Sequence, residues 1–241
     1  MYYKNDGKND SKNKNKKNKL ALFLIIGSLF VLSFLVITPN AAYAADGLFG
    51  GGTGTVGDPY IIEDAADLDA VRNGPNTHYK LGNDINLKAG DPGFDAVEGW
   101  LPICSGIGFW PHYDNFTGSF DGGGHKITGL WINRPDTDFV GLFGWVGEES
   151  EIKNLGIEID ATNTDNTGSI IGVRGGGYVG GLAGYSEGNT ENCYVTGGPV
   201  TGISVVGGLV AHNNGPIKNC YVTSSLVTGQ CIIGGLVGEN D

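Results

Sequence analysis

Basic residues are scarce once the first 44 positions of this chain are set aside. The 241 residues include 15 Lys and Arg and 26 Asp and Glu, and seven of the Lys lie within residues 1–19. Residues 45–241 therefore carry 8 basic and 24 acidic side chains, a net charge of −16. Because such a surface repels phosphate groups, nucleic acid and anionic lipid are not expected as partners.

Cysteine and histidine are too few and too dispersed to indicate metal or disulfide chemistry. The cysteines do not form the dense framework of a small disulfide-stabilised domain: Cys104, Cys193, Cys220 and Cys231. The histidines lack H-E-x-x-H or any other close metal-ligand spacing: His78, His112, His125 and His212. We expect no metal ion and no cofactor, and the sequence does not support a zinc peptidase.

Glycine is abundant, with 43 residues, but it lacks the three-residue period of collagen. Residues 52–57 formally match the G-x-G-x-x-G motif. A dinucleotide site needs a strand before this motif and a helix after it, whereas Asp58 and Pro59 follow here. The motif therefore does not predict a nucleotide cofactor.

The first 44 residues have the order of a secretory signal peptide. Lysines precede an uncharged apolar run at residues 20–37, and Ala42-Tyr43-Ala44 fits the small-x-small rule for cleavage. The alternative is an uncleaved anchor, because an apolar run of this length reaches the lower limit for a membrane span. Membrane contact is expected only through this segment, and only if it is not cleaved.

A repeat with a period of 27 residues dominates the rest of the chain. Val-Val-Gly-Gly-Leu-Val at residues 205–210 has copies at residues 178–183 and 232–237. A fixed period of this size indicates one structural unit stacked on itself. Alternating apolar residues between glycines predict two or three short strands in each unit, so the chain is expected to be an all-β solenoid.

Stacking places equivalent side chains above one another, about 4.8 Å apart. Leucines are expected to form one internal ladder: Leu142, Leu182, Leu209 and Leu236. Asparagines are expected to form a second ladder near a turn, where their amides can bond each other: Asn154, Asn192 and Asn219. The first inter-unit distance is 40 residues rather than 27, and a loop at residues 160–177 is predicted to contain the excess.

Three regions are predicted along the chain. Residues 1–44 form the signal peptide, and residues 45–98 form an N-terminal cap with the first strands. Within this cap, residues 65–72 are expected to form a short helix that Asn73-Gly74-Pro75 ends. Residues 99–241 are predicted to form the β-helix, which stops part-way through a fourth unit and is therefore expected to be truncated. Residues 90–115 show little pattern and are interpreted as a loop.

The G-G-L-V-G core followed by I-x-N-C-Y-V resembles the GLUG motif of bacterial and archaeal surface proteins. The lead-in D-P-Y-I-I and the segment F-x-G-x-F-D-G resemble the start of the same domains, so the resemblance covers about residues 54–241. It implies a right-handed parallel β-helix. The best-known contexts of the family are adhesin-like proteins and extracellular peptidases, in which the repeats are accessory.

Cys193 and Cys220 occupy matched positions 27 residues apart, so adjacent turns could bring them near disulfide distance. In-register stacking fits disulfide geometry poorly, and the alternation of the strand places both cysteines inside. We therefore favour buried free thiols over a disulfide.

Two kinds of candidate functional residue remain. Aromatic side chains could line a sugar-binding face, although simple stacking between turns is the preferred interpretation: Tyr178, Tyr185, Tyr194, Tyr221, Trp131 and Trp145. Carboxylates could serve a polysaccharide lyase or glycosidase, but most lie beside turns: Asp114, Asp121, Asp136, Asp138, Glu148, Glu149 and Glu151.

The sequence favours a secreted or cell-surface protein without enzymatic activity. It would act as an adhesin-like or structural module that contacts glycans or surface proteins. The alternatives are an extracellular polysaccharide lyase or glycosidase on a β-helix, and an accessory repeat domain of a larger surface peptidase. No catalytic residue is assigned.

Overall fold

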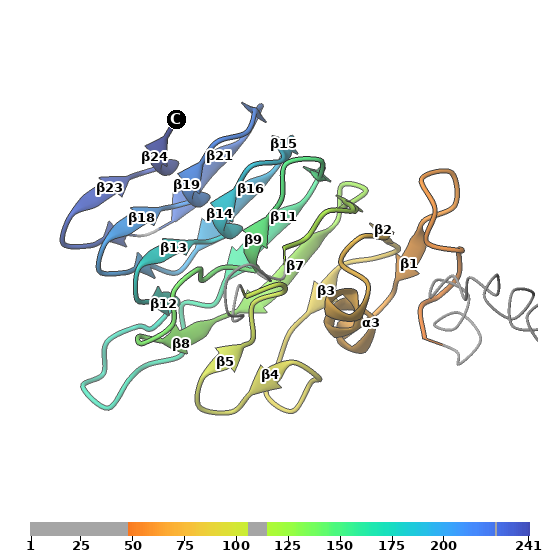
Figure 1. Ribbon diagram of the computed structural model, residues 1–241. Helices are drawn as coiled ribbons and strands as arrows, with labels where there is room; N and C mark the ends of the chain where they lie inside the picture. Colours follow the sequence, from red (N-terminus) through yellow and green to blue (C-terminus); the bar gives the residue numbers. More distant parts are fainter. Residues whose placement is uncertain (1–47, 106–114, 225) are drawn as a thin grey trace, which may run out of the picture. The chain divides into compact units, whose positions relative to one another are not determined.

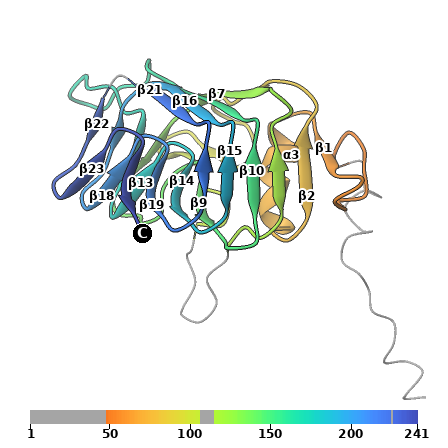
Figure 2. The same cartoon turned by 90° about the horizontal axis from the view of Figure 1, so that it is seen from above.

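The computed structural model describes residues 48–105, 115–224 and 226–241. The predicted signal peptide lies outside these residues, as do Trp110, His112 and Asp114. Within the described part, short strands wind into stacked turns and pair in parallel with their counterparts in the turns before and after (Figures 1 and 2). The described residues form a parallel β-helix with a short α-helix close to its first strand, as the sequence predicted.

Five sheets run along the stack. The first has the order β1 (Tyr60–Ile62), β2 (His78–Leu81), β6 (Ser119–Asp121), β10 (Glu151–Lys153), β15 (Asn189–Glu191) and β20 (Ile217–Lys218). The second, written from its N-terminal end, has the order β3 (Ile85–Asn86), β7 (Lys126–Leu130), β11 (Gly156–Ile159), β16 (Tyr194–Gly197) and β21 (Tyr221–Ser224). Both sheets continue across residue 98, so the first strands form turns of the same stack.

The third sheet contains β4 (Phe94–Asp95), β5 (Gly99–Trp100), β8 (Ile132–Arg134), β12 (Val173–Gly175), β17 (Val200–Thr201) and β22 (Val227–Thr228). Here β5 pairs antiparallel with β4 and β8, whereas the other pairs are parallel. Residues 90–115 were expected to be a loop, but this short hairpin lies within them. Similarly, the loop expected at residues 160–177 contains β12.

The last two sheets complete the regular turns. One contains β13 (Tyr178–Gly180), β18 (Val205–Gly207) and β23 (Ile232–Gly234), and the other contains β9 (Phe143–Val146), β14 (Ala183–Ser186), β19 (Val210–Asn213) and β24 (Val237–Asn240). Each 27-residue turn thus has five strands, and the expectation of two or three was wrong. Corners recur so often because glycine allows them: a Cβ on Gly207 would lie 1.9 Å from the Val210 carbonyl oxygen.

The N-terminal end of the stack is covered. Helix α3 (Ala65–Ala70) begins at Asp64, whose carboxylate accepts the N–H groups of Ala66 and Asp67 at 2.8 and 3.0 Å. The helix continues into the 3₁₀ turn η3 (Val71–Asn73), which ends at Gly74. Leu68, Ala70 and Val71 of this segment are buried in the core, and the predicted short helix is confirmed.

A glycine-rich segment protects the free edge of β1. The Gly50 N–H donates to the Ile61 carbonyl at 2.8 Å, and the Ile61 N–H donates to the Gly51 carbonyl at 2.9 Å. The Phe49 ring stacks on Tyr60 with 4.6 Å between ring centroids. The first strand therefore has partners on both sides, which blocks pairing with another chain at this end.

Candidate functional site

The repeated leucines share the dry interior of the stack. Leu142, Leu182 and Leu209 are fully buried, whereas Leu236 in the last turn is partly buried against the same core. The Leu182 N–H donates to the Leu209 carbonyl, and the Leu209 N–H donates to the Leu236 carbonyl, each at 2.8 Å. These residues hold successive turns in register.

The repeated asparagines are bonded to one another through their side-chain amides. The Asn219 amide donates to Asn192 Oδ1 at 3.2 Å, and the Asn192 amide donates to Asn154 Oδ1 at 3.1 Å. The Asn154 amide donates to Asp121 Oδ1 at 2.9 Å, so Asp121 ends the ladder. All three asparagines have φ between +53° and +54°, a left-handed conformation that the sequence pattern did not reveal.

Cys193 and Cys220 lie in adjacent turns and are free thiols. Cys193 is buried, Cys220 is half-buried, and the Cys193 N–H donates to Cys220 Sγ at 3.4 Å. The hydrogen bond between the thiols, together with burial, raises the pKa of Cys193. The same hydrogen bond lowers the pKa of Cys220. Both thiols donate to backbone carbonyls, Cys193 to those of Ile152 and Glu191 and Cys220 to those of Thr190 and Lys218.

The six candidate aromatic residues do not form one face. Tyr194 and Tyr221 stack on each other, 5.2 Å apart and 9° from parallel. Trp131 packs edge-on against Phe94 at a ring distance of 5.6 Å. The remaining three residues belong to a larger group, described next, and the single sugar-binding face considered for this set is therefore absent from the described structure.

The aromatic cluster consists of Phe139, Trp145, Tyr178, Tyr185 and His212. Tyr185 lies 4.8 Å from Trp145 and 4.9 Å from His212, and Phe139 stacks on Tyr178 at 5.2 Å and 4°. Trp145, Tyr185 and His212 are register partners in β9, β14 and β19. His212 was not among the aromatic residues expected from the sequence, although it follows Tyr185 by one repeat period of 27 residues.

Polar contacts fix the aromatic cluster in place. The Trp145 indole N–H donates to Glu187 Oε2 at 3.2 Å, and the Asn214 amide donates to the Tyr185 hydroxyl at 2.9 Å. His212 Nδ1 lies 3.3 Å from Glu239 Oε2, and His212 Nε2 lies 3.2 Å from Asp241 Oδ2. Burial raises the pKa of Tyr185. Because the rings pack against one another, the main contribution of the cluster is to hold neighbouring turns together.

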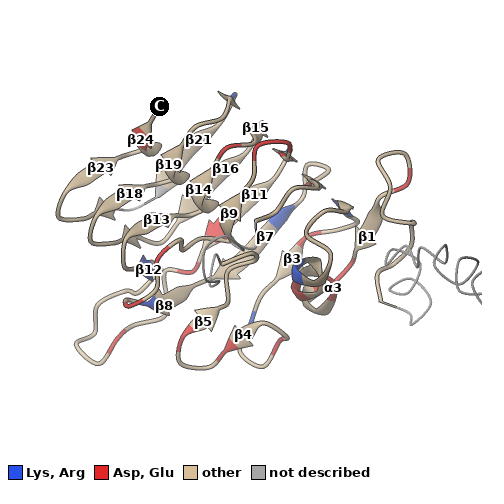
Figure 3. Ribbon diagram, viewed as in Figure 1, with Lys and Arg blue, Asp and Glu red and all other residues tan. Residues whose placement is uncertain are grey.

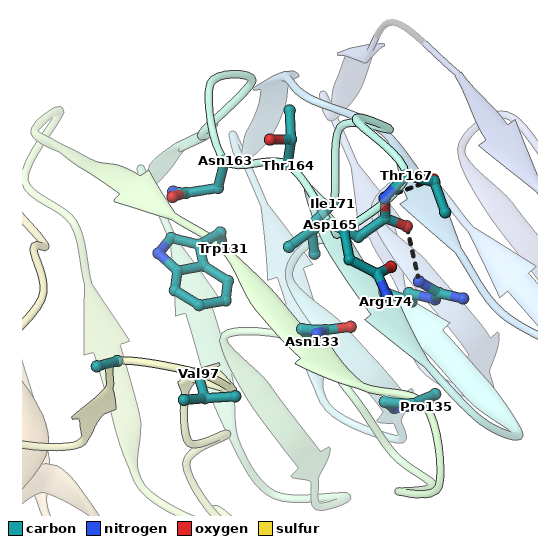
Figure 4. A pocket seen from close by; sticks show the side chains of 12 residues that line it. Val97, Trp131, Asn133, Pro135, Asn163, Thr164, Asp165, Thr167, Ile171 and Arg174 are labelled. Atoms are coloured by element: carbon teal, nitrogen blue, oxygen red, sulfur yellow. Dashed lines mark hydrogen bonds and ion pairs between the residues drawn. The ribbon is translucent and has the colours of Figure 1, made fainter.

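A groove of about 560 Å³ lies beside the third sheet, at the surface of β8 and β12. We call it the Trp131 groove, and its lining includes Val97, Trp131, Asn133, Asp165, Ile171 and Arg174. Figure 4 shows the Trp131 indole between Val97 and Asn163, with Ile171 and Asn133 next to it and Arg174 farther away, beside Asp165. Its volume is within the range of roughly 300–1,000 Å³ that is typical of small-molecule sites.

Two segments that interrupt the 27-residue period form the walls of the Trp131 groove, and an aspartate shapes each. Asp95 accepts the N–H groups of Val97 and Glu98 at 2.6 and 2.9 Å, and these bonds lower its pKa. Asp165 accepts the Thr167 hydroxyl at 2.6 Å and the N–H groups of Thr167 and Ser169, which lowers its pKa. Each ionised carboxylate therefore stabilises the turn whose N–H groups it accepts.

Two of the candidate carboxylates stabilise a turn or a ladder, and Glu151 forms an ion pair with Lys153. Asp121 Oδ1 accepts the Gly123 N–H as well as the Asn154 amide, and Asp138 Oδ1 accepts the Gly177 N–H. Acidic residues lie mainly in turns and loops along the stack (Figure 3). Among residues 48–105, 115–224 and 226–241, no group of three His, Cys, Asp or Glu is placed to hold a metal ion.

The stacked turns and their side-chain ladders define a repeat solenoid of the parallel β-helix class. Residues 175–201, one complete 27-residue turn, match the family model of the GLUG motif. The chain therefore contains a GLUG motif, and the resemblance inferred from its residues is confirmed.

Two relatives share part of their sequence with this chain. A protein from Evansella cellulosilytica, provisionally named a Gly-rich membrane protein, is 39% identical over 164 residues, which cover 67% of this chain and 18% of the relative. Halomucin from Haloquadratum walsbyi is 33% identical over 149 residues, which cover 61% of this chain and 2% of the relative. The chain thus spans a small fraction of the length of either protein.

One solved structure has a similar fold. It is a protein from Bacteroides ovatus that was provisionally named an immunoglobulin A1 protease, with a TM-score of 0.53 and 22% identity. The match covers 82% of this chain and 66% of the other, and it shows a shared fold. Within the described residues, no helix is long and apolar enough to cross a membrane.

Proposed function

We propose that this chain is a non-enzymatic module of a secreted or cell-surface repeat protein that acts as an adhesin-like or structural element. The observation that carries this proposal is that the repeated side chains hold successive turns together. In each of these turns a leucine packs in the core and an asparagine amide forms a hydrogen bond with the neighbouring turn. The repeated residues therefore build a stalk, and recognition falls to residues outside the repeat.

The relatives and the charge of the chain support a surface location. One relative is named as a membrane protein and the other as a mucin. The net charge of −16 on residues 45–241 suits a protein that must stay soluble in contact with salt solution. Surface exposure is tested by treating intact producing cells with an external protease and following the chain by immunoblotting. Loss of the full-length band is expected, and full protection in intact cells would contradict the surface location.

The binding role is tested with the purified chain on glycan arrays and on whole cells. Binding above that of an unrelated protein of similar acidity is expected. Equal signals for the two proteins would contradict the adhesin-like role and would be consistent with a structural role alone.

The second candidate function is an extracellular hydrolase or lyase, or an accessory domain of a peptidase. It is favoured by the fold shared with the provisionally named immunoglobulin A1 protease, although fold alone does not imply activity. The chain is incubated with pectin-like and other acidic polysaccharides, with and without calcium, and with immunoglobulin A1. We expect no released sugar and no cleaved protein. Product formation that an Asp→Ala change abolishes would overturn the non-enzymatic assignment.

A further inference from the structure

The Trp131 groove combines an apolar floor with an apolar rim. Trp131 and Ile171 line the floor and are each only 8% exposed, whereas Val97 at the rim is 73% exposed. Phe94 packs against the indole from the protein side, so the ring has a fixed position. A fixed indole at the base of an open groove is suited to packing against the apolar face of a flat ligand.

Polar side chains that are free to bind a ligand surround this floor. Within the described part of the chain, the side chains of Asn133, Thr164 and Asn166 make no hydrogen bond, yet all three line the groove. Asp165 and Arg174 lie 3.6 Å apart, which is too long for a hydrogen bond between them. The groove therefore offers amide, hydroxyl, carboxylate and guanidinium groups around an apolar surface.

The charges of the groove favour a neutral ligand over an acidic one. The negative Asp165 balances the positive Arg174, and the chain as a whole is strongly acidic. An anionic sugar would meet the repulsion of that field without an unpaired cation to compensate for it. Neutral sugars, in contrast, present hydroxyl groups that can donate and accept at the same time.

We propose that the Trp131 groove binds a neutral sugar residue of a glycan chain. The sugar ring packs on Trp131, and its hydroxyl groups bond to Asn133, Asp165 and Arg174. This inference rests on the proposed function and adds the ligand class and the site. The aromatic cluster is the weaker candidate, because its rings already stack on one another and its polar groups already have partners.

The full chain is titrated by calorimetry with neutral oligosaccharides of glucan, mannan, galactan and xylan, and with an acidic oligogalacturonate. The variants Asn133→Ala and Arg174→Ala remove polar groups of the groove and leave its floor intact. Lys126→Ala is the matched control, since it breaks an exposed ion pair with Glu158 on another sheet. Circular dichroism and thermal unfolding establish that every variant folds.

We expect at least one neutral oligosaccharide to bind. Asn133→Ala should weaken binding about 2- to 10-fold, and Arg174→Ala about 10-fold or more, since hydrogen bonds to charged groups contribute more. Lys126→Ala should bind like the parent chain. Three results would each overturn the inference: no binding across the panel, binding of the acidic oligosaccharide alone, or equal affinity in the parent and both groove variants.

Repeating the cell-binding assay with the groove variants separates the two proposals. Cell binding that is lost with Asn133→Ala and Arg174→Ala supports the groove as the contact site. Cell binding that survives both changes rules out the groove as the contact site and leaves the adhesin-like function supported. Cell binding that is absent even for the parent chain contradicts the adhesin-like function itself.

Discussion

At the scale of the residue, asparagine meets two requirements at the same corner of three turns. The corner needs a left-handed backbone, with φ near +53° at Asn154, Asn192 and Asn219. Asparagine tolerates this conformation better than other residues with a side chain beyond Cβ, and its amide donates and accepts along the stack. Glycine would satisfy the backbone alone, which explains why asparagine stands there in a chain otherwise rich in glycine.

Substitutions at Asn192 separate the two requirements. Asn192→Ala should lower the free energy of unfolding by about 1–3 kcal/mol, because it strains the left-handed backbone and removes two side-chain hydrogen bonds. Asn192→Gly should lower the free energy of unfolding by less, since it removes only the hydrogen bonds. Urea denaturation of the parent and both variants measures this difference. If alanine and glycine are equally destabilising, the backbone conformation does not select the residue.

The paired thiols give a second prediction at the residue scale. Because the pKa of Cys220 is lowered and that of Cys193 is raised, Cys220 forms a thiolate at lower pH than an ordinary thiol does. In the Cys231→Ser background, iodoacetamide should label Cys220 first in the folded chain, with a rate that rises at lower pH than in the unfolded chain. Peptide mass spectrometry follows each site. Faster labelling of Cys193, or identical pH profiles for folded and unfolded chains, would contradict the assignment.

At the scale of the element, one strand position has different surroundings in different turns. Leu209 is enclosed by turns on both sides, whereas its equivalent Leu236 lies in the last turn and is partly exposed. The contribution of an equivalent leucine to stability thus depends on the turns that pack against it more than on its sequence context, as in other stacked repeats.

Alanine at these two positions tests this dependence. Leu209→Ala should lower the free energy of unfolding by about 2–5 kcal/mol, because it leaves a cavity in a closed core. Leu236→Ala should cost clearly less, since water can enter the space that it leaves. Chemical denaturation monitored by circular dichroism gives both values. Equal losses would show that the last turn is as well packed as the inner ones.

At the scale of the whole molecule, the surroundings of equivalent side chains change along the stack. Residues 48–55 cover the edge of β1, and side chains of β23 are more exposed than their equivalents in the preceding turn. Ile232 and Ile233 are 42% and 47% exposed, and their equivalents Val205 and Val206 are 5% and 0% exposed. In a chain of residues 1–241, stability along the stack is therefore expected to decrease toward β23 and β24.

Hydrogen exchange measures this gradient directly. Amides of β23 and β24 should exchange faster than those of β13 and β14, because outer strands open without disturbing a following turn. Mass spectrometry of peptides from the two turns compares them within one sample. Uniform exchange along the stack would show that the β-helix opens as a single unit.

The sequence alone determined the solenoid, because equivalent residues in stacked turns must recur at one fixed distance. The period of 27 residues predicted stacked turns of short strands and placed Leu182 above Leu209, and the GLUG resemblance implied the parallel β-helix. Helix and turn signals predicted a short helix at residues 65–72, where the structure has α3. Only the tertiary structure decided what breaks that period. Phe139 reaches Tyr178 across 39 residues, and the segments that carry Val97 and Asp165 line one groove. Interruptions of a repeat carry no fixed offset, so their contacts depend on how each segment folds back onto the stack.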